Sequence, residues 1–255
     1  MKDNVVLAGN NVQKIYRNEL NKQFIALKNI NLKLYAGDFT VIMGPAGAGK
    51  SSLLYSLSGL EEINSGTIQY GEKNLALFSE QEKNNFRKNE IGFISHGSQL
   101  LPNLTIGENV ALPNYLIEKN KDTAEQRATD ILKTLGLTEQ LNCWPGELSQ
   151  GQQQLAVIAR SLVNQPKIIF ADEPTATLTN FASQEILDCL SELNQKKQQT
   201  IVLATDDLNV ALRGNRLLYL NDGMICYDAN LGDYHRQHNG QRKQQLVAFL
   251  TEWGW

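Results

Sequence analysis

Hydrophobic and polar side chains alternate along the first forty residues, a pattern that predicts β-strands. The alternation covers Val5-Val6-Leu7, Ile25-Ala26-Leu27 and Ile30-Asn31-Leu32-Lys33-Leu34, and Ala36-Gly37-Asp38 has the composition of a turn. We expect these segments to form antiparallel strands. They lead into a further apolar strand, Phe39-Thr40-Val41-Ile42-Met43.

Beyond residue 60, short apolar runs alternate with stretches of helical spacing. The pattern predicts a strand at 65–71, a polar, lysine-rich helix at 79–89, a strand at 91–94, and helices between 104 and 136 in an insertion that ends near Pro145. Two unbroken apolar runs, at 167–171 and 200–204, flank a helical segment at 180–195. Such runs are typical of a parallel sheet covered on both faces. The predicted fold class is α/β, a parallel-sheet core with an N-terminal antiparallel β part and an inserted helical part.

A glycine-rich loop joins the strand at 39–43 to a helix. The loop reads Gly44-Pro45-Ala46-Gly47-Ala48-Gly49-Lys50-Ser51. Glycines let consecutive backbone N–H groups turn inward, and the helix start adds partial positive charge, so this context suits a phosphate group. Lys50 can reach the β- and γ-phosphates, and the Ser51 hydroxyl can ligate Mg²⁺. The loop predicts binding of a nucleoside triphosphate; the alternative is a glycine-rich turn with an accidental lysine.

Two carboxylates follow the apolar run that begins at Lys167. Asp172 and Glu173 stand where that strand ends, at the edge of a parallel sheet where ligand sites form. In phosphoryl transfer to water, Asp172 would support the shell of a metal ion, and Glu173 would orient or deprotonate the attacking water. The alternative is an acidic pair that only begins a loop.

A second helix start carries residues suited to phosphate oxygens. Leu148-Ser149-Gln150-Gly151-Gln152 opens the helical pattern that continues to Leu162. Alone the motif is weak, because a serine and a glutamine at this spacing also make an ordinary helix cap.

Composition adds limits on partners and location. The chain has 255 residues, with 42% hydrophobic and 20% charged residues and a net charge of −3, values typical of a globular protein without a general attraction for nucleic acid. We expect no membrane-spanning segment, a cytosolic location, and reduced thiols at Cys143, Cys189 and Cys226.

Together, and in this order, the motifs resemble the nucleotide-binding subunit of ATP-binding cassette (ABC) transporters from roughly Val12 to Tyr227. The resemblance implies a P-loop NTPase (RecA-like) core that binds ATP and Mg²⁺, with 44–51 as the Walker A loop, 168–172 as the Walker B strand and 148–152 as the family signature. It implies one domain with its core at 1–90 and 160–228, a helical subdomain at 91–159 and a tail at 229–255. The implied nucleotide-binding residues are Tyr16, Gly44, Pro45, Ala46, Gly47, Ala48, Gly49, Lys50, Ser51, Ser52, Ser149, Gly151 and Gln152. The implied metal-binding residues are Ser51, Asp172 and His96, and turnover is expected to depend on Glu173, Lys50, His96 and Asp206.

Within the family, the stretches 92–94, 100–105 and 108–110 resemble the macrolide-exporter and lipoprotein-releasing group. The resemblance implies a second ATP-binding subunit, packed head to tail with ATP between one Walker A loop and the partner's signature. It also implies an integral membrane permease, which would hold this chain peripherally on the inner face of the cell membrane. The permease would dock at about 96–113, where Leu100 and Leu101 are either docking residues or ordinary packing residues.

Four positions depart from the family pattern. His96 replaces the Q-loop glutamine, Gln150 the first signature glycine, Thr179 the D-loop aspartate and Asp206 the switch histidine. Asp206 would bring a negative charge beside the γ-phosphate and Glu173, and like charges resist sharing that space. We therefore expect slow hydrolysis and a role as the degenerate half of a heterodimer.

Three rival functions stay open on the sequence. They are a fully active ABC transport ATPase, a P-loop phosphotransferase, and a non-transport ABC protein acting on ribosomes or DNA.

The C-terminal tail has two interpretations as well. Residues 241–250 predict a short amphipathic helix that either packs on the parent domain or docks a partner, and Trp144 is expected to anchor the packing of the helical part.

Overall fold

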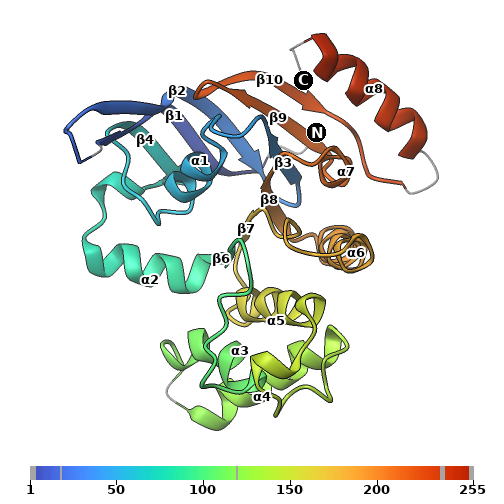
Figure 1. The fold of residues 1–255 in the computed structure, drawn as a ribbon. Helices are drawn as coiled ribbons and strands as arrows, with labels where there is room; N and C mark the ends of the chain where they lie inside the picture. Colours follow the sequence, from blue (N-terminus) through green and yellow to red (C-terminus); the bar gives the residue numbers. More distant parts are fainter. Residues whose placement is uncertain (1–3, 18, 119, 236–238, 253–255) are drawn as a thin grey trace. The chain divides into compact units, whose positions relative to one another are not determined.

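The computed structural model describes residues 4–17, 19–118, 120–235 and 239–252. The chain divides into two compact units, one formed by residues 1–79 with 194–255 and the other by residues 80–193 (Figure 1).

The first unit begins with an antiparallel sheet, as the alternation predicts. Its strands lie in the order β2-β1-β4-β5. They are β1 (Val5–Arg17), β2 (Gln23–Tyr35), β4 (Ser65–Tyr70) and β5 (Lys73–Asn74). A short 3-10 helix, η1 (Leu75–Leu77), follows β5. The expected strands in the first forty residues and at 65–71 are therefore confirmed.

The second sheet segment of this unit is mostly parallel. In it β3 (Phe39–Met43) pairs in parallel with β8 (Thr200–Thr205) on one side and with β9 (Arg216–Asn221) on the other. Every residue of β3 and β8 is buried, which explains why their sequences are unbroken apolar runs. The helices α1 (Lys50–Leu57) and α7 (Leu208–Ala211) follow β3 and β8.

An antiparallel hairpin that we did not predict follows β9. The strand β10 (Met224–Asn230) pairs with β9 through a turn at Asp222 and Gly223, which have φ of 45° and 73°. Asp-Gly is a strong hairpin signal because both residues tolerate positive φ. The dipeptide therefore marked this turn in the sequence.

The C-terminal helix α8 (Asn239–Glu252) packs on this hairpin (Figure 1). Leu246 and Leu250 are buried, and the Phe249 ring stacks on Tyr227 at 3.8 Å between centroids and meets Tyr219 edge-on at 6.3 Å. The predicted amphipathic helix is confirmed, and its apolar face is used for packing on the parent unit.

Arg242 anchors α8 by its guanidinium. Its Nη1 donates to the carbonyls of Leu231 (3.0 Å), Gly232 (3.1 Å) and Asp233 (3.3 Å), and its Nη2 donates to that of Gly214. The residue is only 9% exposed, so these carbonyls supply the partners that a buried cation needs.

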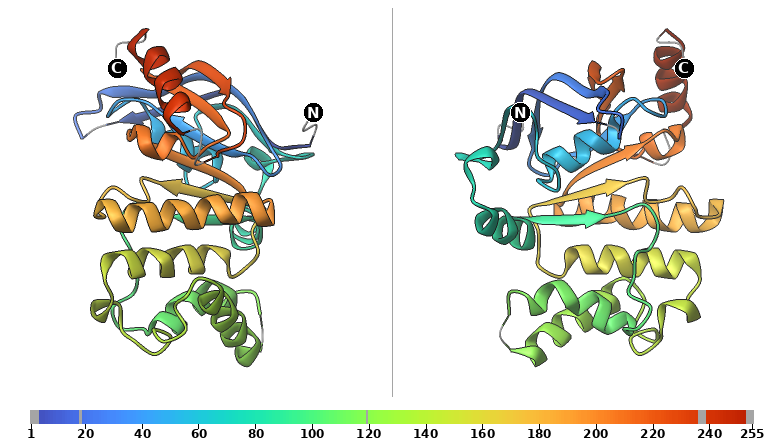
Figure 2. Two further views of the ribbon diagram at one scale, coloured as in Figure 1. Left: turned by 90° about the vertical axis from the view of Figure 1, so that its right-hand side faces the viewer. Right: turned by 60° about the vertical axis from the view of Figure 1, so that its left-hand side comes forward.

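The second unit contains a pair of parallel strands and most of the helices (Figure 2). The pair is β6 (Ile91–Ile94) with β7 (Ile168–Asp172). The helices are α2 (Glu80–Glu90), α3 (Ile106–Tyr115), α4 (Lys121–Thr134), the 3-10 helix η2 (Pro145–Glu147), α5 (Gln150–Leu162) and α6 (Asn180–Lys197), whose last residues belong to the first unit.

The helices α3, α4 and α5 share one apolar core. Ile106 and Val110 of α3, Ala128 and Leu132 of α4 and Ala159 of α5 are among its fully buried members. The predicted helical insertion is therefore confirmed. Trp144 does not belong to this core, because 47% of its surface is exposed and Pro145 is the buried residue there, so its predicted anchoring role is wrong.

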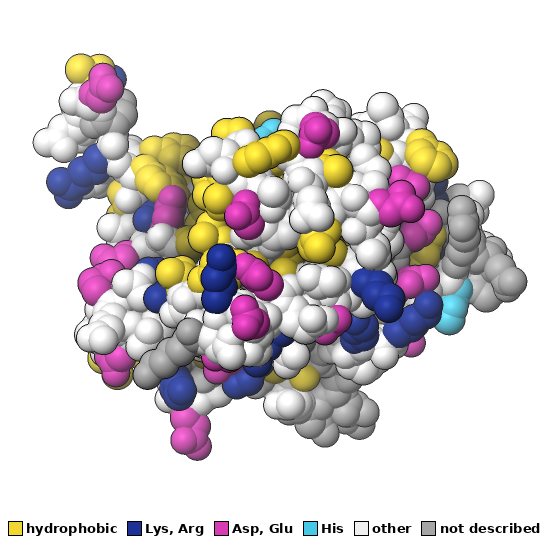
Figure 3. All heavy atoms as spheres, turned by 90° about the horizontal axis from the view of Figure 1, so that it is seen from below, with side chains coloured by type: hydrophobic (Ala, Val, Ile, Leu, Met, Phe, Trp, Pro, Cys, Tyr) yellow, Lys and Arg dark blue, Asp and Glu magenta, His cyan; other side chains and the backbone are white. Residues whose placement is uncertain are grey.

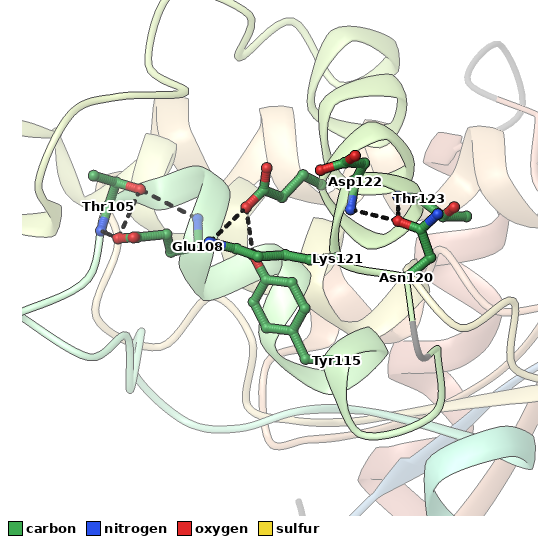
Figure 4. A network of polar contacts seen from close by, with 8 residues as sticks. Thr105, Glu108, Tyr115, Asn120, Lys121, Asp122 and Thr123 are labelled. Atoms are coloured by element: carbon green, nitrogen blue, oxygen red, sulfur yellow. Dashed lines mark hydrogen bonds and ion pairs between the residues drawn. The ribbon is translucent and has the colours of Figure 1, made fainter.

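Side-chain caps fix the ends of these helices (Figure 4). Thr105 and Glu108 form a capping box at α3, and Asn120 caps α4 by accepting from the N–H groups of Asp122 and Thr123. Between them, the Tyr115 hydroxyl donates to Glu125, which also pairs with Lys121 at 3.3 Å.

Among the described helices, none has the length and apolar character to cross a membrane.

Candidate functional site

The phosphate loop of the first unit depends on glycine at three positions. A Cβ on Gly44 would lie 2.0 Å from the carbonyl oxygen of Leu220, and one on Gly49 would lie 2.5 Å from that of Ala26. Gly47 and Gly49 also have φ of 78° and 101°, which L-residues with side chains rarely adopt. Packing and backbone conformation thus fix the path of the loop at these glycines.

Lys50 begins α1 and folds back over the loop. Its ammonium donates to the carbonyls of Gly44 (2.8 Å) and Pro45 (3.2 Å), and the residue is 8% exposed. The N-cap, Gly49, has no side chain, so the first N–H groups of α1 are not capped by it. A helix start with a buried ammonium is an anion site.

Tyr16 lies on β1 and is tied to the same helix. Its oxygen lies 3.2 Å from Oγ of Ser52, in the first turn of α1, and its hydroxyl donates to the carboxylate of Glu61. Burial, followed by the hydrogen bond to Glu61, raises the pKa of Tyr16 above its ordinary value, so the hydroxyl keeps its proton. Lys14 completes the cluster, 3.1 Å from Glu61 and 4.8 Å above the Tyr16 ring.

The two predicted carboxylates stand at the end of β7 in the second unit. Asp172 is 4% exposed, and Glu173 is half-buried with a left-handed φ of 47°. Such a conformation is uncommon for glutamate, and residues held in it occur at functional sites as well as in turns.

The signature residues begin α5. Ser149 is the N-cap, accepting from the Gln152 N–H (3.3 Å), while its own N–H donates to Oε1 of Gln152 (3.0 Å). The hydroxyl proton of Ser149 takes part in neither of these two capping hydrogen bonds, so the hydroxyl can still donate to an anion. A Cβ on Gly151 would lie 3.1 Å from Cβ of Ala182, so the glycine also allows α5 to approach α6 closely.

The loop that carries His96 is fastened to α5. The Ser98 hydroxyl donates to Gln153 Oε1 (2.9 Å), and Gln153 Nε2 donates to the Leu148 carbonyl (3.1 Å). Farther along, Arg160 Nη1 donates to the Gln99 carbonyl (2.9 Å). The predicted docking loop and the signature are thus joined by one side chain, Gln153, whose role we did not predict from the sequence.

The four departures from the family pattern share one property: His96, Gln150, Thr179 and Asp206 are all exposed. Thr179 caps α6 by accepting from the Ala182 N–H (3.4 Å), a role that aspartate fills equally well. The packing of either unit therefore does not require these four residues.

The predicted metal-binding residues are distributed over both units, Ser51 in the first and Asp172 and His96 in the second. The described residues contain no cluster of three or more His, Cys, Asp or Glu side chains arranged to hold a metal. Taken singly, the Ser51 hydroxyl and the buried Asp172 carboxylate each offer the oxygen type of ligand that Mg²⁺ prefers.

Charges on the surface are mixed. On the face shown in Figure 3, basic and acidic side chains are interspersed. The net charge of the whole chain is −3, so its charge gives no general attraction for a polyanion.

Comparisons with known proteins agree on one family. A sequence profile described as ABC transporter matches residues 27–176. The chain is 36% identical to the bacitracin export ATP-binding protein BceA of Halalkalibacterium halodurans, covering 91% of each chain. It is also 36% identical to the lipoprotein-releasing system ATP-binding protein LolD of Wigglesworthia glossinidia brevipalpis, covering 91% of this chain and all of that one. The dimeric structure of the cassette MJ0796 bound to ADP and Pi superimposes with a TM-score of 0.80 at 35% identity, covering 88% of this chain and 98% of that one.

Proposed function

Because this chain belongs to the ABC transporter family and is one of its ATP-binding subunits, we propose that it binds Mg·ATP at its Walker A loop and hydrolyses it slowly. The observation that carries the proposal is the loop itself, where glycine-dependent geometry, a helix start and buried Lys50 together make an anion site.

Each binding residue has a proposed part. The N–H groups of the Walker A loop and the Lys50 ammonium bind the phosphates, and the Tyr16 ring stacks on the adenine. Ser51 and Asp172 would hold Mg²⁺, with His96 as a further ligand of the metal. Bound Mg²⁺ would neutralise negative charge on the β- and γ-phosphates. Ser149, Gly151 and Gln152 bind the nucleotide held by the Walker A loop of a partner subunit.

Slow hydrolysis follows from the chemistry of the exchanged residues. Glu173 supplies the base that orients water, so the reaction is not abolished. A histidine at position 206 would donate a hydrogen bond to the γ-phosphate, whereas Asp206 offers only acceptors and a negative charge. Gln150 adds a side chain at a position where the family has glycine. All four exchanged positions are exposed, so packing does not explain which residues stand there, and this supports a role in turnover.

The test is phosphate release by the purified chain at saturating Mg·ATP. We expect wild type to turn over far more slowly than ordinary transporter ATPases, and Asp206→His to raise the rate at least about tenfold, within the range of positioned proton-transfer groups. Asp207→Asn is the matched control, because it removes the neighbouring negative charge but keeps the cap of α7, where Asp207 accepts from the Asn209 N–H at 2.7 Å. A wild-type rate typical of the family would reject slow hydrolysis, and an unchanged rate in Asp206→His would reject its attribution to Asp206.

We also propose the partners. The chain works with an integral membrane permease, lies peripherally on the cytoplasmic face of the membrane, and pairs with a second ATP-binding subunit whose own turnover residues are complete. Affinity capture from solubilised membranes should bring down both proteins. Recovery of the permease with only further copies of this chain would establish a homodimer instead.

A further inference from the structure

A cluster of polar side chains surrounds the hydroxyl of Tyr16. A phenol carries one proton, and a carboxylate is a stronger acceptor than a hydroxyl, so Tyr16 donates to Glu61 and Ser52 can donate to the Tyr16 oxygen at 3.2 Å. The hydroxyl is therefore held from two sides, and both partners belong to α1 or to the turn that follows it.

Glu61 is itself held firmly. It follows Gly59, which ends α1 with a φ of 70°, and the N–H groups of Leu60 and Glu61 both donate to the Tyr55 carbonyl at 3.0 and 3.1 Å. This turn places Glu61 where its carboxylate accepts from the Tyr16 hydroxyl.

Lys14 fixes the carboxylate from the other side. Its ammonium lies 3.1 Å from Glu61, donates to the Glu62 carbonyl at 2.7 Å and sits 4.8 Å from the centre of the Tyr16 ring. The Lys14 side chain is only 13% exposed, so this contact is partly desolvated and stronger than a surface ion pair.

We propose that Glu61 is a positioning residue for recognition of the nucleotide base: it fixes the orientation of the Tyr16 ring, on which the base stacks. The inference rests on the proposed function, since it needs a nucleotide at the Walker A loop. A ring anchored by its hydroxyl does not lose rotamer freedom when the base stacks on it, so binding costs less entropy. Through Ser52, the ring is also set in register with the helix turn that carries Lys50 and Ser51.

The test compares two ligands by calorimetry: Mg·ATP, and Mg·tripolyphosphate, which lacks the base. We expect Glu61→Ala and Tyr16→Phe each to weaken ATP binding about three- to tenfold, the effect of one ordering hydrogen bond, without changing tripolyphosphate binding. The double variant should be no weaker than either single variant, because both remove the same hydrogen bond. Glu61→Gln keeps an acceptor and should retain most of the affinity.

Controls separate positioning from folding. Glu72→Ala removes an exposed carboxylate from the turn after β4 and should bind ATP like wild type. Thermal midpoints show whether Glu61→Ala is folded. If wild type binds no tripolyphosphate, the proposal is tested by ATP affinity alone: folded Glu61→Ala should bind ATP more weakly than Glu61→Gln, and equal affinities overturn the proposal. Unchanged ATP affinity in Glu61→Ala, or equal weakening of both ligands, overturns the proposal.

Two further variants separate this proposal from the proposed function. Lys50→Ala should abolish binding of both ligands, and if it leaves ATP binding intact the Walker A site itself is refuted. Tyr16→Ala should weaken ATP binding at least as much as Tyr16→Phe. If Lys50→Ala fails to bind while every Glu61 variant binds normally, only the positioning role is lost.

Discussion

Replacing Asn109 by alanine tests how the predicted docking loop is held. Asn109 lies in α3, is fully buried, and bonds four backbone groups of the loop before it. Its Oδ1 accepts from the Leu101 N–H at 2.7 Å, and its Nδ2 donates to the carbonyls of Leu101, Leu104 and Thr105, each at 3.0 Å. One side chain therefore fixes five residues of irregular backbone.

The size of the effect follows from these contacts. The side chain makes at most three full hydrogen bonds, because its two Nδ2 protons are shared among three carbonyls. At about 1 kcal/mol net each, these give about 3 kcal/mol, and carbonyls left buried without a donor add to the cost. Leu101 is 42% exposed, which lets water reach some of the released groups. We expect Asn109→Ala to lower the free energy of unfolding by about 2–4 kcal/mol.

Urea unfolding of purified protein measures this loss. Asn103→Ala is the matched control, because it removes an exposed asparagine from the same loop and should change stability by less than about 0.5 kcal/mol. Mg·ATP affinity should stay unchanged in folded Asn109→Ala, while capture of the permease falls. A stability loss under about 1 kcal/mol would refute the reasoning that this side chain holds the loop.

Three further predictions follow from particular contacts. Gly44→Ala places a Cβ 2.0 Å from the Leu220 carbonyl, so it should abolish ATP binding in calorimetry and lower the thermal midpoint. Arg242→Met leaves buried carbonyls without their donor and should cost about 2–4 kcal/mol in urea unfolding, whereas Lys243→Met, at an exposed site, should cost little. Burial, then the hydrogen bond to Glu125, raises the pKa of Tyr115 to about 12. The folded state thus binds this proton more tightly, so stability should fall as pH rises from about 10 to 12, and less steeply in Tyr115→Phe.

Local patterns predicted much of the fold. Alternation identified β1 and β2, because a strand buried on one face alternates apolar and polar residues. Unbroken apolar runs identified β7 and β8, because a strand buried on both faces is apolar throughout. The β9–β10 hairpin was missed although Asp222 and Gly223 carried its turn signal.

The candidate site was predictable to a lesser extent. The glycines, Lys50 and Ser149 form motifs because their chemistry depends on neighbours in the chain. Glu61 carries no such signal: it meets Tyr16 across 45 residues, and only the folded sheet and the turn after α1 bring them together. A side-chain contact between residues so far apart in the sequence can be identified only in the folded structure.

The exposure of the four exchanged residues has an experimental consequence. Substitutions at these positions do not disturb the interior of either unit, so variants can be compared by catalytic rate at nearly equal thermodynamic stability. At Thr179 the replacement has to keep a cap for α6, which aspartate does. Each position can therefore be given the family residue singly, without a second change elsewhere in the chain.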